Sequence, residues 1–247
     1  MTAPAPHANV DAGRAMTSLA NRDVPAAERT LAIALVELDA PWTSTPPVER
    51  ALAAIEALGL PLTQATGDLQ RTWRGYDRAT AAAAVWPGGD RTAVMLASDD
   101  RATVATVARS GRQPGQFRNT VTVTLPAAEV ARRGTEGVAA MVAQLAAALP
   151  AFAYATASAA NLVSFPSLLD VAPLPAPLVT SAWLHVLAPA IVARLGGAAR
   201  LRAAPVTVEA RADGTVWMRT YPDPMAYDTE AAVAAMRALA ASLGTGA

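Results

Sequence analysis

The alternation of apolar and polar positions along the chain predicts its strands. Residues 30–39 (TLAIALVELD) form an apolar run that is typical of a strand. Residues 119–126 (NTVTVTLP) alternate threonine with valine and leucine, as in an antiparallel strand with one exposed face. Two pairs of segments flank turn formers and therefore predict hairpins: residues 79–87 with 91–98, and residues 204–211 with 214–221.

Helical spacing, with apolar residues three and four positions apart, recurs in three further segments: residues 47–58, 135–149 and 228–244. Gly59 and Pro150 end the first two, because glycine favours a helix C-cap and proline cannot continue a helix. Asp228 or Thr229 caps the third. The sequence therefore predicts at least three helices of ordinary length.

The segment 182–201 (AWLHVLAPAIVARLGGAARL) also has apolar residues at helical spacing. Pro189 lies in its middle and removes one helical hydrogen bond, so we expect a kinked or restarted helix there. Gly196 and Gly197 supply the left-handed cap that ends it.

The order of these elements indicates an α+β fold with a mainly antiparallel sheet that helices cover on one face, because strands and helices do not alternate strictly. We expect a mobile N-terminal arm at residues 1–27 and a single domain at residues 28–247. A weak internal boundary near residues 165–179, which are rich in proline, would separate two similar halves. One continuous sheet is the alternative.

The composition excludes several kinds of catalytic and metal-binding chemistry. All 20 basic residues are arginine, and the chain has no lysine and no cysteine. The absence of lysine excludes a Walker phosphate loop and Schiff-base catalysis, and the absence of cysteine excludes thiol nucleophiles, disulfides and cysteine-ligated metals. No glycine-rich loop follows a strand, so no nucleotide cofactor is expected.

Charge and hydropathy bear on partners and location. The formal net charge is zero, so the chain has no overall attraction for nucleic acid or an anionic membrane, and we expect neither as a direct partner. No segment has the apolar length of a signal-peptide core or a membrane helix. A cytoplasmic location is therefore expected.

Side chains capable of catalysis are few. The chain has two histidines, His7 in the expected arm and His185, and it lacks the G-x-S-x-G motif of serine hydrolases. We expect His185 to face solvent or to cap a neighbouring group rather than to act as a base. Asp99 and Asp100 follow a strand and could hold a divalent metal, but aspartate in turns more often shapes the backbone. No catalytic residue, metal or other cofactor is expected, and we predict that the protein is not an enzyme.

The C-terminal part of the sequence is similar to a known family. The features that match are Trp183 and Leu184, the internal Pro189, the Leu195-Gly-Gly stop, and the hairpin that ends at Pro222 and Asp223. This stretch, about a quarter of the chain, resembles the C-terminal segment of a family of bacterial immunity proteins linked to type VI secretion and other polymorphic-toxin systems.

The resemblance implies a binding function. The protein would hold a cognate toxic effector in an inactive complex in the producing cell, and in one branch of such families the toxin is similar to nucleases. An effector adaptor or chaperone, which binds without inhibiting, is the first alternative, and a small metal-dependent hydrolase using Asp99 and Asp100 is the second. A homodimer is also compatible with the sequence.

Aromatic, arginine and acidic side chains in turns are the candidate contacts with a partner, because such side chains often dominate protein interfaces. Trp183 and Trp217 are instead expected to pack in the core. The candidates are Trp42, Trp73, Arg74, Tyr76, Asp77, Asp99, Asp100, Tyr221, Asp223 and Tyr227.

Overall fold

The computed structural model describes residues 25–38, 42, 45–67, 72–85, 91–111, 117–149, 151–159 and 182–243. Its strands are β1 (Thr30–Leu38), β2 (Gln64–Gly67), β3 (Arg74–Gly75), β4 (Arg91–Ala97), β5 (Val104–Gly111), β6 (Phe117–Pro126), β7 (Phe152–Ala159), β8 (Leu184–Leu187), β9 (Thr207–Ala210) and β10 (Val216–Arg219). Its helices are the short 3-10 turn η1 (Ala26–Glu28), α2 (Thr45–Glu56), α3 (Arg78–Val85), α4 (Ala127–Ala148), α6 (Pro189–Arg194), α7 (Gly197–Arg202) and α8 (Glu230–Leu243).

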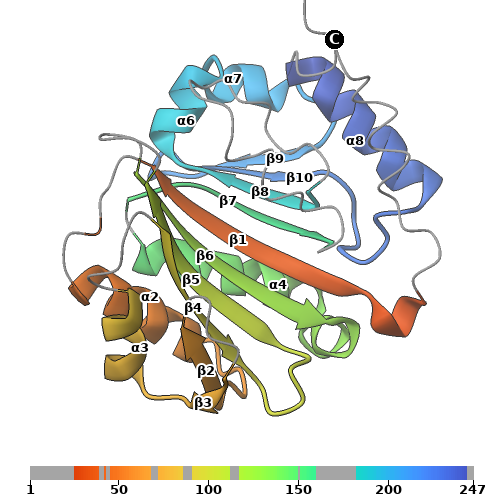
Figure 1. The fold of residues 1–247 in the computed structure, drawn as a ribbon. Helices are drawn as coiled ribbons and strands as arrows, with labels where there is room; N and C mark the ends of the chain where they lie inside the picture. Colours follow the sequence, from red (N-terminus) through yellow and green to blue (C-terminus); the bar gives the residue numbers. More distant parts are fainter. Residues whose placement is uncertain are drawn as a thin grey trace, which may run out of the picture.

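All ten described strands form one antiparallel sheet in the order β3-β2-β4-β5-β6-β1-β7-β8-β10-β9 (Figure 1). The expected α+β class with an antiparallel sheet is therefore confirmed, and the sheet is continuous through the described residues. Of the expected N-terminal arm, residues 26–28 form η1, while residues 1–24 and the expected boundary at 165–179 lie outside the described part of the chain.

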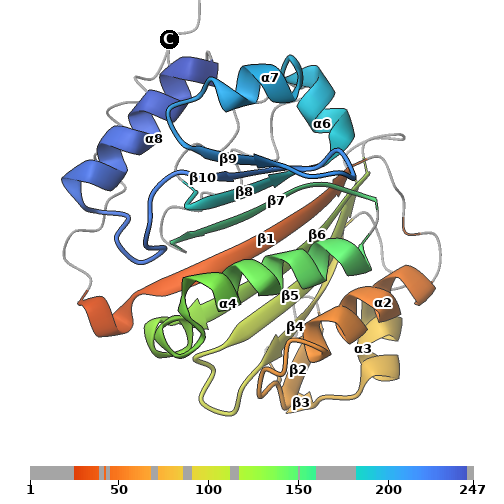
Figure 2. The same ribbon diagram turned by 180° about the vertical axis from the view of Figure 1, so that it is seen from behind.

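Helices cover both faces of the sheet rather than one, which corrects the expectation. Helices α2, α3 and α4 lie on one side of the central strands and α6, α7 and α8 on the other (Figures 1 and 2). Alternate residues of β1 show why: Ile33 belongs to the apolar cluster of α2–α4, whereas Val36 belongs to the cluster of Ile191 and Leu201. A strand that is apolar on both faces needs cover on both.

An internal similarity relates the two ends of the sheet. Strands β5-β6-β1 and β9-β10-β8 flank β7 in mirrored order. In the chain, each set begins with the strand next to β7, which is β1 or β8, and ends with a hairpin (β5-β6 or β9-β10) and a helix (α4 or α8), with further helices in between. Strands β1 and β8 point the same way because each is antiparallel to β7. A half-turn about an axis along β7 therefore matches the two sets, and the same rotation moves the helices from one face to the other.

Most of the predicted elements are present. Strands β1, β6, β9 and β10 and helices α2, α4 and α8 lie where the pattern placed them. On β6 the valines face the core and the threonines are half exposed, as the alternation predicted. Thr229 caps α8, since its Oγ1 accepts a hydrogen bond from the amide of Ala232 at 3.2 Å.

The predicted hairpin at 79–98 is wrong in its first arm, because residues 78–85 form helix α3. Its alanines have high helix propensity, and Asp77 caps its start by accepting the amide hydrogen of Thr80 at 2.8 Å. That hydrogen bond also lowers the pKa of the Asp77 carboxyl. The second arm forms strand β4 as predicted.

The predicted helix at 182–201 is also wrong in its first part, where residues 184–187 form strand β8 between β7 and β10. All four residues are buried, and periodicity cannot distinguish a short, fully buried strand from a helix. Pro189 begins α6 instead of interrupting a longer helix, and Gly196 adopts the expected left-handed conformation with φ of 93°.

Candidate functional site

Trp42 is buried and is not a surface contact, which corrects its assignment as a candidate. Its side chain is 3% exposed, and its indole Nε1 donates a hydrogen bond of 2.7 Å to Oε2 of Glu37. The same carboxylate oxygen accepts a hydrogen bond from Nδ2 of Asn119 at 3.2 Å. Trp42 therefore satisfies a buried acidic side chain of β1.

Six other candidates come together at one end of the sheet. Strand β2 pairs with both β3 and β4, so that Gln64 lies opposite Gly75 on one side and Ala97 on the other. The turn after β4 therefore lies beside the residues that flank β3. We call the resulting group the β3-edge surface; it consists of Trp73, Arg74, Tyr76, Asp77, Asp99, Asp100 and Arg101.

Two of the three aspartates of this surface, Asp99 and Asp100, lie in the turn between β4 and β5. Asp100 accepts hydrogen bonds from Oγ of Ser98 at 2.5 Å and from the amide of Ala102 at 3.0 Å, and these lower the pKa of its carboxyl. Asp99 accepts a hydrogen bond of 2.5 Å from Oγ1 of Thr63 at the start of β2. Both side chains are exposed, and both hold local structure.

Arg101 is the unusual residue of the β3-edge surface. Its φ of 58° lies in the left-handed region, the one positive φ at a non-glycine residue in the described part of the chain. Its guanidinium carbon lies 5.1 Å from the centre of the Trp73 ring, within the range of a cation–π contact. The backbone of Arg101 is therefore strained where its side chain meets the half-exposed ring of Trp73. No sequence pattern predicts this pairing, since the two residues are far apart in the chain.

Tyr76 connects this surface to helices α2 and α3. Its hydroxyl donates a hydrogen bond of 2.6 Å to Oε1 of Glu56, and Arg78 pairs with the same carboxylate. Burial, with the neighbouring Glu56 carboxylate, raises the pKa of Tyr76, while the hydrogen bond from Arg78 lowers the pKa of Glu56. The contact with Glu56, which Arg78 holds in turn, fixes the position of the Tyr76 side chain.

Replacement of Arg101 separates backbone strain from the cation–π contact. We expect Arg101→Gly to be more stable than Arg101→Ala by about 1 kcal/mol, because glycine adopts a positive φ without strain and both variants lose the contact. Urea unfolding followed by far-ultraviolet circular dichroism measures the difference. An alanine variant as stable as the glycine variant would show that Arg101 is not strained.

The remaining three candidates, Tyr221, Asp223 and Tyr227, lie near the end of β10. Both tyrosines are buried, at 5% and 2% exposure, and so are not the surface contacts that we expected. Asp223 is exposed, and its Oδ1 accepts the amide hydrogen of Met225 at 2.9 Å. Arg29 packs 5.1 Å from the centre of the Tyr227 ring and forms an ion pair of 2.6 Å with Asp228.

His185 is buried at 1% exposure on β8 and does not face solvent, contrary to expectation. It lies opposite Thr156 and Met218, and neither ring nitrogen makes a hydrogen bond of normal geometry. Burial lowers the pKa of His185 to about 4. The imidazole is therefore neutral at pH 7 and part of the core.

Within the part of the chain that the structure describes, no group of three or more histidine, cysteine, aspartate or glutamate side chains is arranged to hold a metal ion. Among the helices described, none combines the length and the apolar character that crossing a membrane requires.

Comparison with known proteins gives a structural likeness. No family model and no curated protein matches the sequence. Among solved structures, the chain is similar to the Pseudomonas aeruginosa T6SS protein PA0821, with a TM-score of 0.61 and 16% sequence identity over 88% of this chain and 73% of that chain. At this identity the likeness establishes a shared fold.

Proposed function

We propose that the protein acts by binding another protein through the β3-edge surface, and that it is an immunity protein that neutralises a cognate toxic effector in the cytoplasm of the producing cell. The observation that carries the proposal is the strained Arg101 held against Trp73 beside the exposed Arg74. Arginine and tryptophan are the residue types most enriched among side chains that dominate binding energy.

The geometry of this edge favours contacts through side chains. Strand β3 has only two residues, both exposed, so it offers little backbone for a partner strand to pair with. Asp77 and Asp99 add exposed carboxylates around the aromatic group. Three aspartates against two arginines leave the β3-edge surface with a small acidic excess, which a basic cleft, such as that of a nuclease, would complement.

The secretion context rests on two further supports. The C-terminal segment resembles immunity proteins of type VI and related toxin systems, and the structural neighbour PA0821 is described as a T6SS protein. Both supports are also compatible with an adaptor or chaperone that binds an effector without blocking it. The two functions differ in what happens to the activity of the bound effector.

The test is binding and inhibition of the effector encoded beside the gene. We expect a stable complex in which the toxin is inactive, and we expect Trp73→Ala to weaken binding about 30-fold or more, as for an interface residue of high energetic weight. Isothermal titration calorimetry measures the affinity, and survival on co-expression measures protection.

A matched control exists at the other edge of the sheet, where Arg211 lies 3.8 Å from the centre of the Trp217 ring. Arg211→Ala should bind the toxin as tightly as the wild type, because it removes an arginine–tryptophan contact far from β3. An active toxin in the complex would identify an adaptor instead. Equal loss of binding in both variants, or no complex with a neighbouring effector, would remove the proposal.

A further inference from the structure

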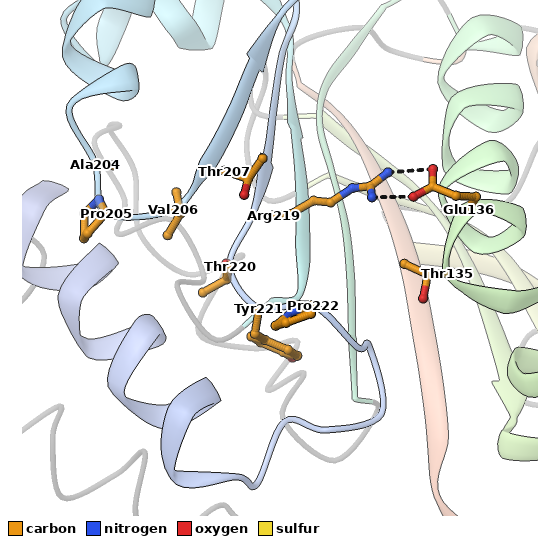
Figure 3. Close-up of a pocket in the computed structure, with 10 residues that line it drawn as sticks. All are labelled: Thr135, Glu136, Ala204, Pro205, Val206, Thr207, Arg219, Thr220, Tyr221 and Pro222. Atoms are coloured by element: carbon orange, nitrogen blue, oxygen red, sulfur yellow. Dashed lines mark hydrogen bonds and ion pairs between the residues drawn. The ribbon is translucent and has the colours of Figure 1, made fainter.

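A cleft with a volume of about 680 Å³ lies between α4, the end of β10 and the chain that leads into β9 (Figure 3). It is separate from the β3-edge surface, since β9 and β3 are the two opposite edges of the sheet. Arg219 of β10 reaches across the cleft to Glu136 of α4. Thr135, Thr220 and Tyr221 also line it.

The ion pair across the cleft holds a carboxylate in a defined geometry. Nη1 and Nη2 of Arg219 donate to the two carboxylate oxygens of Glu136 at 2.5 and 2.8 Å. The Glu136 side chain is 76% exposed, whereas that of Arg219 is 33% exposed and lies 5.8 Å from the centre of the buried Trp183 ring. Glu136 can therefore swing into water while Trp183 keeps the guanidinium in place.

The backbone of α4 adds a second attraction for a negative group. Gly134 has φ of 68° and ψ of 173°, which breaks α4 into two helical segments. The second segment begins at Thr135, so the positive end of its dipole lies at the cleft. Glu136, in the first turn of this segment, is the resident negative charge there.

Two residues that line the cleft have buried hydroxyl groups without hydrogen-bond partners. Oγ1 of Thr220 and Oη of Tyr221 are shielded from solvent and have no hydrogen-bond partner, and both residues are 5% exposed. Figure 3 shows the two residues directly after Arg219 in the chain, with the Thr220 side chain directed away from the Arg219–Glu136 pair. Buried hydroxyls without partners are costly, so each of them would gain from a hydrogen-bonding partner.

We propose that this cleft is a binding site for a carboxylate from another molecule, which replaces Glu136 on Arg219. The planar fork of Arg219 already binds a carboxylate through both nitrogens, and Thr135, Thr220 and Tyr221 are among the residues that line the cleft. Glu209 acts electrostatically on the same arginine, so a singly charged carboxylate fits better than doubly charged phosphate. The inference does not depend on the toxin-binding proposal.

The test uses three probes with the full-length protein: a short acetylated peptide with a free C-terminal carboxylate, a C-terminally amidated peptide with one internal glutamate, and inorganic phosphate. We expect at least one carboxylate probe to shift the amide NMR signals of Gly134, Thr135 and Gly137. We expect Glu136→Gln to tighten its binding about fivefold, because the variant removes an exposed internal competitor. Arg219→Gln should abolish binding.

Tyr221→Phe separates a ligand contact from a structural role. Because the hydroxyl is buried without a partner in the structure, its removal should not lower stability, and it should weaken carboxylate binding about threefold or more. Arg211→Ala is the matched arginine control and should bind like the wild type. Whichever carboxylate probe binds identifies the source as a chain terminus or an acidic side chain. Failure of both with folded Glu136→Gln, or tighter binding of phosphate, would overturn the proposal.

Discussion

Replacing Trp42 with alanine is expected to lower the free energy of unfolding by about 4 kcal/mol, the cost of truncating a large buried aromatic side chain. The substitution leaves a cavity and removes one of the two hydrogen bonds to the buried Glu37 carboxylate. Trp42→Phe keeps most of the volume and should cost about 2 kcal/mol, because it removes mainly the hydrogen bond to a charged group. Urea unfolding followed by far-ultraviolet circular dichroism measures both.

Trp73→Ala is the matched control for this prediction. It makes the same chemical change at a half-exposed residue of the β3-edge surface, and should cost only about 1 kcal/mol. The two tryptophans thus have opposite expected roles, one in stability and one in binding. A Trp42→Ala variant as stable as Trp73→Ala would contradict the buried position of Trp42.

The second large expected effect is a dependence of the unfolding free energy on pH. Between pH 7 and pH 5 the wild type should lose about 2 kcal/mol of unfolding free energy through His185. Its pKa falls from 6.5 in the unfolded chain to about 4 in the fold, so in this interval the unfolded state binds the extra proton. Stability is therefore full above pH 6.5 and declines as the pH falls toward 4.

His185→Leu tests this assignment, because leucine fits a buried strand position and does not titrate. Its unfolding free energy should change by less than about 0.5 kcal/mol between pH 7 and pH 5. Paired carboxylates such as Glu129, whose pKa is lowered to about 2 by Arg132 and Arg133, matter only at more acidic pH. An equal loss in the leucine variant would place the proton uptake on another group.

The strands and helices with one exposed face were predictable from the sequence. Strand β6 alternates apolar and polar residues, and the second segment of α4 has apolar residues at three- and four-residue spacing. Both patterns arise because one side of the element faces solvent. Strand β8 has no such signal, because it is covered on both faces and is only four residues long, too short for its apolar run to be distinguished from part of a helix. The alanine run of α3 was misassigned because a glycine-rich turn outweighed a local preference for helix.

Predictions of the candidate site depended on exposure, which one sequence does not determine. Trp73 and Asp99 were proposed separately, and the pairing of β2 with both β3 and β4 brought them to one surface. Trp42 and Tyr221 lie among polar residues and prolines in the sequence, which is typical of exposed turns, but both are buried. The burial of Trp42 follows from Glu37, whose carboxylate in an otherwise apolar strand needed a donor.

The alanines of β7 bear on the dimensions of the cleft. Ala155, Ala157 and Ala159 are fully buried on the face of the sheet that packs against α4, so the helix approaches this strand closely. Their methyl groups act as spacers that set how far the helix stands from the sheet. The span that Arg219 must bridge to reach Glu136 is thus fixed by the bulk of side chains on a strand that supplies no lining residue.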